Sequence, residues 1–241
     1  YFEHSVPRHE LDISDTFLSW GWGKKSKIKK VPSPIILNKN YRHNSNGKIL
    51  LVFTDAREQF SYFSTDSFWG ERSEIYVKEQ IELISLLAKK LTNKFDIKLY
   101  PAKDFYQKKI SNEASAKIKK SSTRIITHGT NFNKLILNYK LSIFNYNGTT
   151  FLQTIGTNKP AMLFLDKKIM PHKKNKIFSN LKKAGILHYD KNSLTNKILE
   201  VQPKIETWWN KPNVLNARHE FCEAYVRRSK NYLKIYSKAI K

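Results

Sequence analysis

The sequence predicts an α/β fold: a Rossmann-like parallel sheet with helices on both faces, followed by a helical C-terminus. Three observations support this prediction. Short apolar runs with the length of buried strands recur between residues 48 and 188, amphipathic helical stretches separate them, and the chain beyond residue 190 contains helical patterns only. Strands that alternate with helices pair in parallel, and the helices cover both faces of the sheet.

The first 47 residues do not follow this alternation. Residues 1–23 begin with polar and charged residues, and the aromatic segment Phe17–Gly23 then predicts a short strand followed by a turn. Residues 24–47 are basic and are interrupted by Pro32, Pro34 and Gly47. Because such residues punctuate structure, we interpret residues 24–47 as a linker or as the exit from a preceding domain.

The alternation begins with the apolar run Lys48–Phe53, which predicts a buried strand. A long amphipathic helix follows at Ser73–Thr92, where leucines and isoleucines recur at helical spacing on one face. The later predicted elements are strands at Phe95–Tyr100, Arg124–Thr127, Leu141–Phe144, Ala161–Leu165 and Gly185–His188, and helices at Ser115–Lys120, Lys176–Ala184, Ser193–Val201, Pro203–Trp209, Asn213–Arg227 and Asn231–Ala239. Gly185 is the predicted stop of the helix before it.

Length and composition limit the possible classes. The chain has 241 residues, enough for one large domain or two small ones, and it contains no apolar run of 18 residues, so no transmembrane helix is expected. It begins with Tyr1 rather than Met, and we therefore expect it to be part of a longer protein. The single cysteine, Cys222, excludes an internal disulfide and a Cys-based zinc site; its helical context predicts a core residue.

The formal net charge is +24, which raises the possibility of a nucleic-acid partner. The 36 lysines far outnumber the 8 arginines, however, and they are dispersed in pairs along the chain. Dispersed pairs are typical of solvated faces. The charge therefore favours contact with an anionic membrane surface or an anionic acceptor over binding of nucleic acid.

The segment Asn145–Gln153 is the most informative motif, because it joins a strand to a helix that is expected to end near Asn158. Asn147 or Thr149 can cap this helix, and Gly148 allows a ligand to approach the backbone. A helix N-terminus presents free N–H groups and a partial positive charge, so the motif predicts a phosphate or anion site. The competing interpretation is an ordinary turn, since Asn-Gly before Thr-Thr is common turn chemistry.

Two further residues follow strands of the same predicted sheet. Arg57 can form forked hydrogen bonds to phosphate, and the alternative is a surface ion pair with Asp55 or Glu58. His128 can donate to a phosphate or act in acid–base chemistry, and the alternative is a histidine satisfied within its loop. Ligands of parallel α/β sheets bind beyond the carboxyl ends of the strands, so we expect both residues, with Tyr100, on the edge that carries the motif.

Other candidates favour structural interpretations. His4 and His9 are five residues apart, so they do not share a helical face, and the sequence has no HExxH pattern. No metal site is therefore expected. The pair Trp208-Trp209 lies in a helical segment, where aromatic residues usually pack in the core.

Several segments occur in an order that resembles a known family. They are Asp12–Trp22 (DISDTFLSWGW), Leu99–Pro101 (LYP), Tyr146–Gln153 (YNGTTFLQ), Asn158–Phe164 (NKPAMLF), Trp208-Trp209 and Ala217–Tyr225 (ARHEFCEAY). Together they resemble the carboxyl-terminal part of transferases from O-antigen gene clusters of Leptospira and other bacteria. That family is distantly similar to CDP-glycerol glycerophosphotransferases and to glycosyltransferases of the two-Rossmann, or GT-B, architecture.

The resemblance implies a division of the chain. Residues 1–46 would be the tail of an incomplete N-terminal acceptor domain with its linker, and residues 47–241 a donor nucleotide-binding domain with C-terminal helices. The catalytic base would lie upstream of this chain in a His-Gly motif, so the fragment alone is expected to be inactive. The family pattern has Glu where this chain has Gln153, which can accept a hydrogen bond from a ribose but carries no charge.

We therefore expect a transferase of bacterial surface-polysaccharide synthesis. It would move a sugar or a polyol phosphate from a nucleotide-sugar or CDP-polyol donor to a saccharide or lipid-linked acceptor. The expected donor-binding residues are Arg57, Tyr100, His128, Asn147, Gly148, Thr149, Thr150 and Gln153. We expect no cofactor, no nucleic-acid partner, and a location in the cytoplasm at the inner face of the inner membrane. The alternatives are a non-enzymatic nucleic-acid binder, suggested by charge, and a silent scaffold domain, suggested by Gln153.

Overall fold

The computed structural model describes residues 5–36, 44–53, 56–57, 68–69, 71–91, 94–99, 105–118, 122–127, 131–165 and 175–240. Within these ranges, six strands form one parallel sheet in the order β10-β9-β8-β3-β6-β7. They are β3 (Lys48–Val52), β6 (Phe95–Lys98), β7 (Ile125–Ile126), β8 (Tyr139–Phe144), β9 (Ala161–Phe164) and β10 (Leu187–His188). The central strands β3, β8 and β9 bury nearly every side chain, because helices cover both faces of the sheet.

Numbered along the chain and read from β7, these strands lie in the order 3-2-1-4-5-6, which is the strand order of the Rossmann fold. The first strand, β3, and the fourth, β8, are neighbours, and Val52 pairs with Phe144 at their carboxyl ends. From this central pair the chain moves outward, first to β6 and β7 and later to β9 and β10. Ligands of open α/β sheets bind beyond the carboxyl ends of the strands at this switch point.

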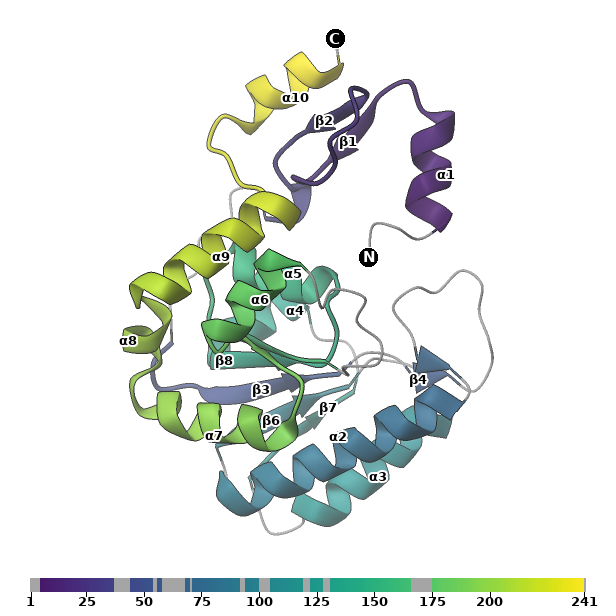
Figure 1. Cartoon of the computed structure of the whole chain (residues 1–241). Coiled ribbons are helices and arrows are strands. Elements are labelled where there is room, and N and C mark those ends of the chain that lie inside the picture. The colour runs from purple at the N-terminus through teal and green to yellow at the C-terminus, as the bar shows by residue number, and fades with distance from the viewer. Residues whose placement is uncertain are drawn as a thin grey trace.

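The helices cover the sheet in two groups (Figure 1). One face carries α2 (Glu71–Lys90), α3 (Phe105–Ile118) and α7 (Lys191–Val201), and the other carries α4 (Phe132–Leu135), α5 (Thr149–Gly156), α6 (Lys176–Lys183) and α9 (Pro212–Tyr225). The short helices η2 (Ile136–Asn138), η4 (Gln202–Lys204) and α8 (Ile205–Trp209) lie between them in the chain. The first crossovers therefore pass over one face and the later ones over the other, as right-handed connections require.

A row of aromatic rings holds α5 and α9 against the sheet. The ring centroid of Phe144 in β8 lies 5.6 Å from that of Phe151 in α5, which lies 5.6 Å from that of Phe221 in α9. Both contacts are edge-to-face, an arrangement that aromatic quadrupoles favour. The three side chains are fully buried. The helix that follows β8 is therefore fixed in place by packing.

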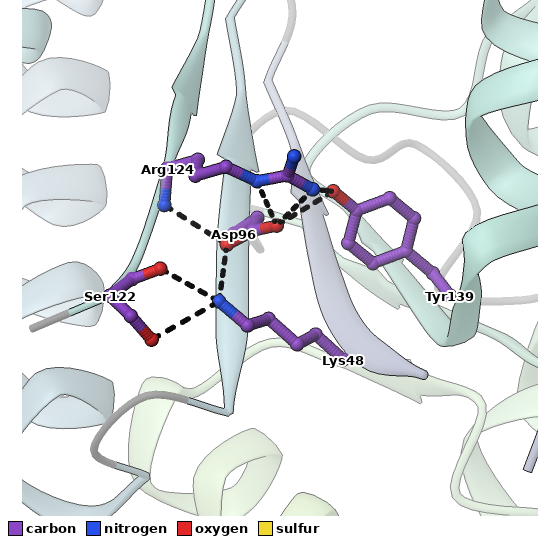
Figure 2. A network of polar contacts seen from close by, with 5 residues as sticks. All are labelled: Lys48, Asp96, Ser122, Arg124 and Tyr139. Atoms are coloured by element: carbon purple, nitrogen blue, oxygen red, sulfur yellow. Dashed lines mark hydrogen bonds and ion pairs between the residues drawn. The ribbon is translucent and has the colours of Figure 1, made fainter. Parts of the chain in front are cut away.

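The amino ends of the strands meet around a buried carboxylate (Figure 2). Asp96 in β6 accepts hydrogen bonds from the Arg124 backbone N–H at 2.9 Å, the Arg124 Nη2 at 3.0 Å, the Tyr139 hydroxyl at 2.8 Å and the Lys48 Nζ at 3.1 Å. Burial alone would raise the pKa of Asp96, but hydrogen bonds from Arg124, Tyr139 and Lys48 lower it below its ordinary value. The ionised carboxylate thus joins β3, β6, β8 and the residue before β7.

The two ends of the chain form a small unit beside α9 (Figure 1). Its elements are α1 (Ser5–Ile13), β1 (Phe17–Ser19), β2 (Ile28–Lys30) and α10 (Tyr232–Ile240), and η1 (Pro34–Ile36) joins it to the main core, where Ile36 is buried. β1 and β2 pair in parallel, and the Tyr236 hydroxyl of α10 donates to the Pro32 carbonyl at 2.7 Å. The first and last segments of the described chain are therefore in direct contact.

Backbone contacts fix this unit on the end of α9. The Arg227 N–H donates to the Trp20 carbonyl at 2.9 Å, and the Ser33 N–H donates to the Arg227 carbonyl at 2.7 Å. At Gly21, φ is +135° and an added Cβ would lie 2.1 Å from the Glu223 carbonyl oxygen. A residue with a side chain therefore cannot replace Gly21 without movement of the backbone.

The predicted fold class is confirmed, and the differences concern short elements and element ends. The helix predicted at Ser73–Thr92 is α2, and the one predicted at Ser115–Lys120 is the end of the longer α3. Residues 24–47 contain β2 and η1, two short elements that the sequence did not predict. β2 and α4 span only three and four residues, too few for a periodic pattern to indicate them. Gly185 has φ +72° and follows α6, as predicted.

Candidate functional site

The candidate site lies at the switch point, where β8 continues through residues 145–148 into α5. The Asn145 N–H donates to the Val52 carbonyl at 3.4 Å, so this loop leaves the sheet directly beside the end of β3. The motif that the sequence analysis singled out therefore occupies the place where Rossmann-like folds bind their ligands.

The N-terminus of α5 has no side-chain cap. Gly148 is the N-cap residue, in an extended conformation with φ −114° and ψ −169°, and no side chain caps the helix. The predicted capping by Asn147 or Thr149 is therefore wrong, because the helix begins one residue later than an Asn147 cap requires. The first helical hydrogen bond runs from the Leu152 N–H to the Gly148 carbonyl at 3.1 Å. The N–H groups of residues 149–151 thus have no partner within the helix and form a positive end.

The side chains around this helix end differ in their hydrogen bonding. Thr149 is exposed, and the Thr150 hydroxyl shares a hydrogen bond with the Tyr146 hydroxyl one turn earlier. The Asn147 Oδ1 atom is buried, and none of the described residues donates a hydrogen bond to it. A buried acceptor without a donor is uncommon in folded proteins.

Gln153 lies on the second turn of α5 and is only 8% exposed. Its Nε2 donates to the Asn133 Oδ1 in the first turn of α4. Asn131 caps α4 by accepting from the Asn133 N–H at 3.0 Å. Gln153 therefore joins α5 to the start of α4, and the structure places its amide nitrogen against protein rather than solvent.

Tyr76 of α2 lies beside this site, although the sequence did not indicate it as a candidate. Tyr76 is 4% exposed, and its hydroxyl accepts a hydrogen bond from the Asn145 Nδ2. The available signal was weak, because a tyrosine on the apolar face of an amphipathic helix is usually a core residue. Its partner lies 69 positions further along the chain, a contact that local pattern does not indicate.

The structure brings together only part of the predicted site. Asn147, Gly148, Thr149 and Thr150 lie around the start of α5. The backbone of Arg57 belongs to β4 (Ala56–Arg57), which pairs in parallel with β5 (Phe68–Trp69), separately from the main sheet. The side chain of Arg57 and the whole of Tyr100 and His128 lie outside the described residues. The roles expected for these three residues therefore stay predictions.

Among the described residues, no group of three or more His, Cys, Asp or Glu side chains could hold a metal ion. Cys222 in α9 packs against the core, and burial raises the pKa of its thiol to about 12, so the thiol is protonated at neutral pH. No helix in the described ranges is long and apolar enough to cross a membrane.

Comparison with known proteins agrees with the fold. A model of the LIC12162 family transferases matches residues 2–240. Curated protein sequences give no match. Among solved structures, a candidate UDP-N-acetylglucosamine 2-epimerase from Listeria monocytogenes superposes with a TM-score of 0.50 and 11% identity, over 89% of this chain and 52% of that one. That likeness shows a shared fold.

Two further solved structures are similar over most of this chain. WaaG, a glycosyltransferase of lipopolysaccharide biosynthesis, gives a TM-score of 0.47 and 12% identity, covering 90% of this chain and 56% of its own. MnaA of S. aureus, solved with UDP, gives 0.46 and 13%, covering 90% and 56%. The chain thus spans about half the length of the solved structures that it matches.

Proposed function

Because this chain belongs to the LIC12162 family of transferases, we propose that it binds a nucleotide-activated donor and takes part in the transfer of a sugar or a polyol phosphate. The diphosphate of the donor binds at the N-terminus of α5. One observation carries the proposal: the uncapped end of this helix lies at the switch point, beside the carboxyl ends of β3 and β8. Helix N-termini at that position recur as phosphate sites in Rossmann-like folds.

In this proposal the site acts on the leaving group. Negative charge grows on the diphosphate as its bond to the transferred group breaks. The N–H groups of residues 149–151 and the helix dipole already point toward that charge, so they stabilise it without rearranging. The exposed Thr149 hydroxyl adds a neutral donor. Arg57, Tyr100, His128 and Gln153 remain further candidates for donor contact.

The acceptor that we propose is a saccharide or a lipid-linked saccharide of a bacterial surface polysaccharide. The enzyme would work in the cytoplasm at the inner face of the inner membrane, without a metal or other cofactor. The net charge of +24 supports contact with anionic lipid or an anionic acceptor, because a basic surface attracts both. Residues 1–46 would belong to an acceptor domain, and residues 47–241 would form the donor domain.

The donor site can be tested by titrating the chain with UDP and CDP in a calorimeter, with uridine and cytidine as phosphate-free controls. We expect at least one diphosphate to bind ~10-fold or more tightly than its nucleoside, because charge-assisted contacts to the phosphates add to contacts with the base. If neither diphosphate binds more tightly than its nucleoside, the phosphate site at α5 is wrong.

A pair of variants at the first helical residue isolates the role of the helix end. Thr149→Asp places a negative charge on the exposed first position of α5, where it stabilises the helix by about 0.3–1 kcal/mol and repels a phosphate. We expect it to lower diphosphate affinity by ~10-fold or more while thermal stability is kept or raised. Thr149→Asn, similar in size and neutral, should bind nearly as well as wild type. Equal affinities of the two variants would contradict the proposal.

A further inference from the structure

The geometry points to Tyr76 as a positioning residue of the donor site. It does not touch the donor; it holds the loop that carries the phosphate-binding N–H groups. This inference rests on the proposed function, because it assigns a role to Tyr76 only if the start of α5 binds a ligand. Tyr76 lies on α2, which covers the face of the sheet opposite to α5 (Figure 1).

The end of β8 is held from both faces of the sheet. Successive side chains of a strand point to opposite faces. The ring of Phe144 contacts Tyr146 at 6.3 Å between centroids and Phe151 of α5 at 5.6 Å, so these side chains lie on the α5 side. Asn145, between them, points the other way and donates its Nδ2 to the Tyr76 hydroxyl. The loop is therefore held by α5 on one side and by α2 on the other.

The hydrogen bond between Tyr76 and Asn145 is buried, so its loss is costly. Tyr76 and Asn145 are each 4% exposed, so water does not readily replace a lost partner. A buried amide that loses a hydrogen bond is destabilised by more than the bond itself contributes, because it is not rehydrated. The Tyr76 side chain reaches the end of β8 from α2 and offers its hydroxyl oxygen as an acceptor there. Phenylalanine would fill the same space without it.

The consequence for binding follows from the short distance along the chain. Asn145 precedes the N-cap Gly148 by three residues, so the position of Asn145 constrains the position of the first turn of α5. A loop that is already ordered loses less conformational entropy when a ligand binds. Removal of the Tyr76 hydroxyl should therefore weaken nucleotide binding even though no contact with the nucleotide is removed.

The test compares two substitutions of the same chemistry at opposite edges of one sheet. Tyr76→Phe removes the buried hydroxyl near the candidate site, and Tyr139→Phe removes one at the amino edge, where it bonds Asp96 at 2.8 Å. Calorimetric titration with the better-binding of UDP and CDP, and urea unfolding, are measured for both. We expect both variants to unfold at lower urea, and only Tyr76→Phe to bind the nucleotide about tenfold more weakly.

A second variant keeps the inference testable if Tyr76→Phe is poorly folded. Asn145→Ala breaks the same contact from the other partner, and it should also weaken nucleotide binding. In the double variant the two losses should not add, because both single variants break the Tyr76–Asn145 hydrogen bond. Unchanged affinity in Tyr76→Phe, or equal losses in Tyr76→Phe and Tyr139→Phe, overturns the positioning role while leaving the donor site intact. Failure of the wild-type chain to bind either diphosphate overturns both.

Discussion

The polar groups at the two edges of the sheet differ in whether they have hydrogen-bond partners. At the amino ends of the strands, the Asp96 carboxylate accepts hydrogen bonds from Arg124, Tyr139 and Lys48 and is fully buried (Figure 2). At the carboxyl ends, the N–H groups of residues 149–151 have no partner within α5, and no described residue donates to the Asn147 Oδ1. At the amino edge the polar side chains are hydrogen-bonded to one another, whereas at the carboxyl edge the N–H groups of α5 have no partner within the helix.

The difference shows where stability and binding reside in this fold. A buried charge that is surrounded by donors fixes the strands that supply them, and its loss leaves those donors without an acceptor. The N–H groups at the start of α5 are held in a fixed direction by the helix, so they can bind a ligand without rearranging. Substitutions at the amino edge should therefore change stability alone, whereas substitutions at the carboxyl edge should change affinity, with or without a change in stability.

The largest effect on stability is expected from Asp96→Asn. The amide keeps the shape of the carboxylate but presents an NH₂ group to donors that need an acceptor. We expect a loss of about 3 kcal/mol in the free energy of unfolding at pH 7, measured by urea denaturation. Nucleotide affinity measured under folding conditions should not change. A variant that loses affinity but keeps its stability would contradict the division between the two edges.

Acid provides the control for this prediction. The folded-state pKa of Asp96 is lowered, so its stabilising contribution is complete above the pKa of about 4 expected for an unfolded carboxyl group. The contribution disappears as the pH falls below that value and through the folded-state pKa. The stability difference between wild type and Asp96→Asn should therefore shrink in this acidic range and be constant from about pH 6 to 8.

A stabilising substitution is expected at Lys159→Met. Lys159 precedes β9 at the amino edge, is 2% exposed, and burial lowers its pKa to about 8. Because the unfolded side chain has a pKa of about 10.4, the folded state disfavours the charged form. Lys159 also makes an interaction that the substitution removes, so we expect Lys159→Met to raise the free energy of unfolding at pH 7 by about 2 kcal/mol, less than the full cost of burying the charge. The wild type should gain stability between pH 8 and about 10, and the variant should not.

The smallest effect is expected from Arg124→Gln. The Arg124 side chain is 68% exposed, and exposed ion pairs contribute about 0–1 kcal/mol. The backbone N–H of residue 124 still donates to Asp96 in the variant, because that contact does not depend on the side chain. We expect a loss of at most about 1 kcal/mol in urea unfolding. A loss as large as that of Asp96→Asn would show that the guanidinium, rather than the buried donors, holds the carboxylate.

The fold class could be predicted because buried strands appear in the sequence as short apolar runs. Ile49–Phe53 and Ala161–Leu165 are apolar along their whole length, as strands buried on both faces are. The order of the strands in the sheet does not appear in the sequence in this way, because it depends on pairing between strands that are far apart in the sequence. The adjacency of β3 and β8, which creates the switch point, could therefore not be predicted from composition or periodicity.

Part of the candidate site could be predicted, because that part is formed by residues that follow one another along the chain. The motif after β8 was identified because a strand, a glycine-containing turn and a helix follow one another along the chain. The cap assignment failed because the path of a loop decides which residue precedes the first turn, and Asn147 and Gly148 are both acceptable cap residues. The partners of Asn145 and Gln153 are Tyr76 and Asn133, 69 and 20 positions away, and such contacts appear only in the folded chain.

The contact between the chain ends has a consequence for the order in which the molecule opens. The hydrogen bond from Tyr236 to Pro32 closes a loop of 204 residues. In the folded chain Ser33 is already bonded to Arg227, so this contact orders only the short segment between Arg227 and Tyr236. In α10, all of which is described, no side chain is fully buried, so few contacts keep the loop closed. The ends should therefore separate and rejoin many times during the lifetime of the folded sheet, as a local opening that leaves its centre intact.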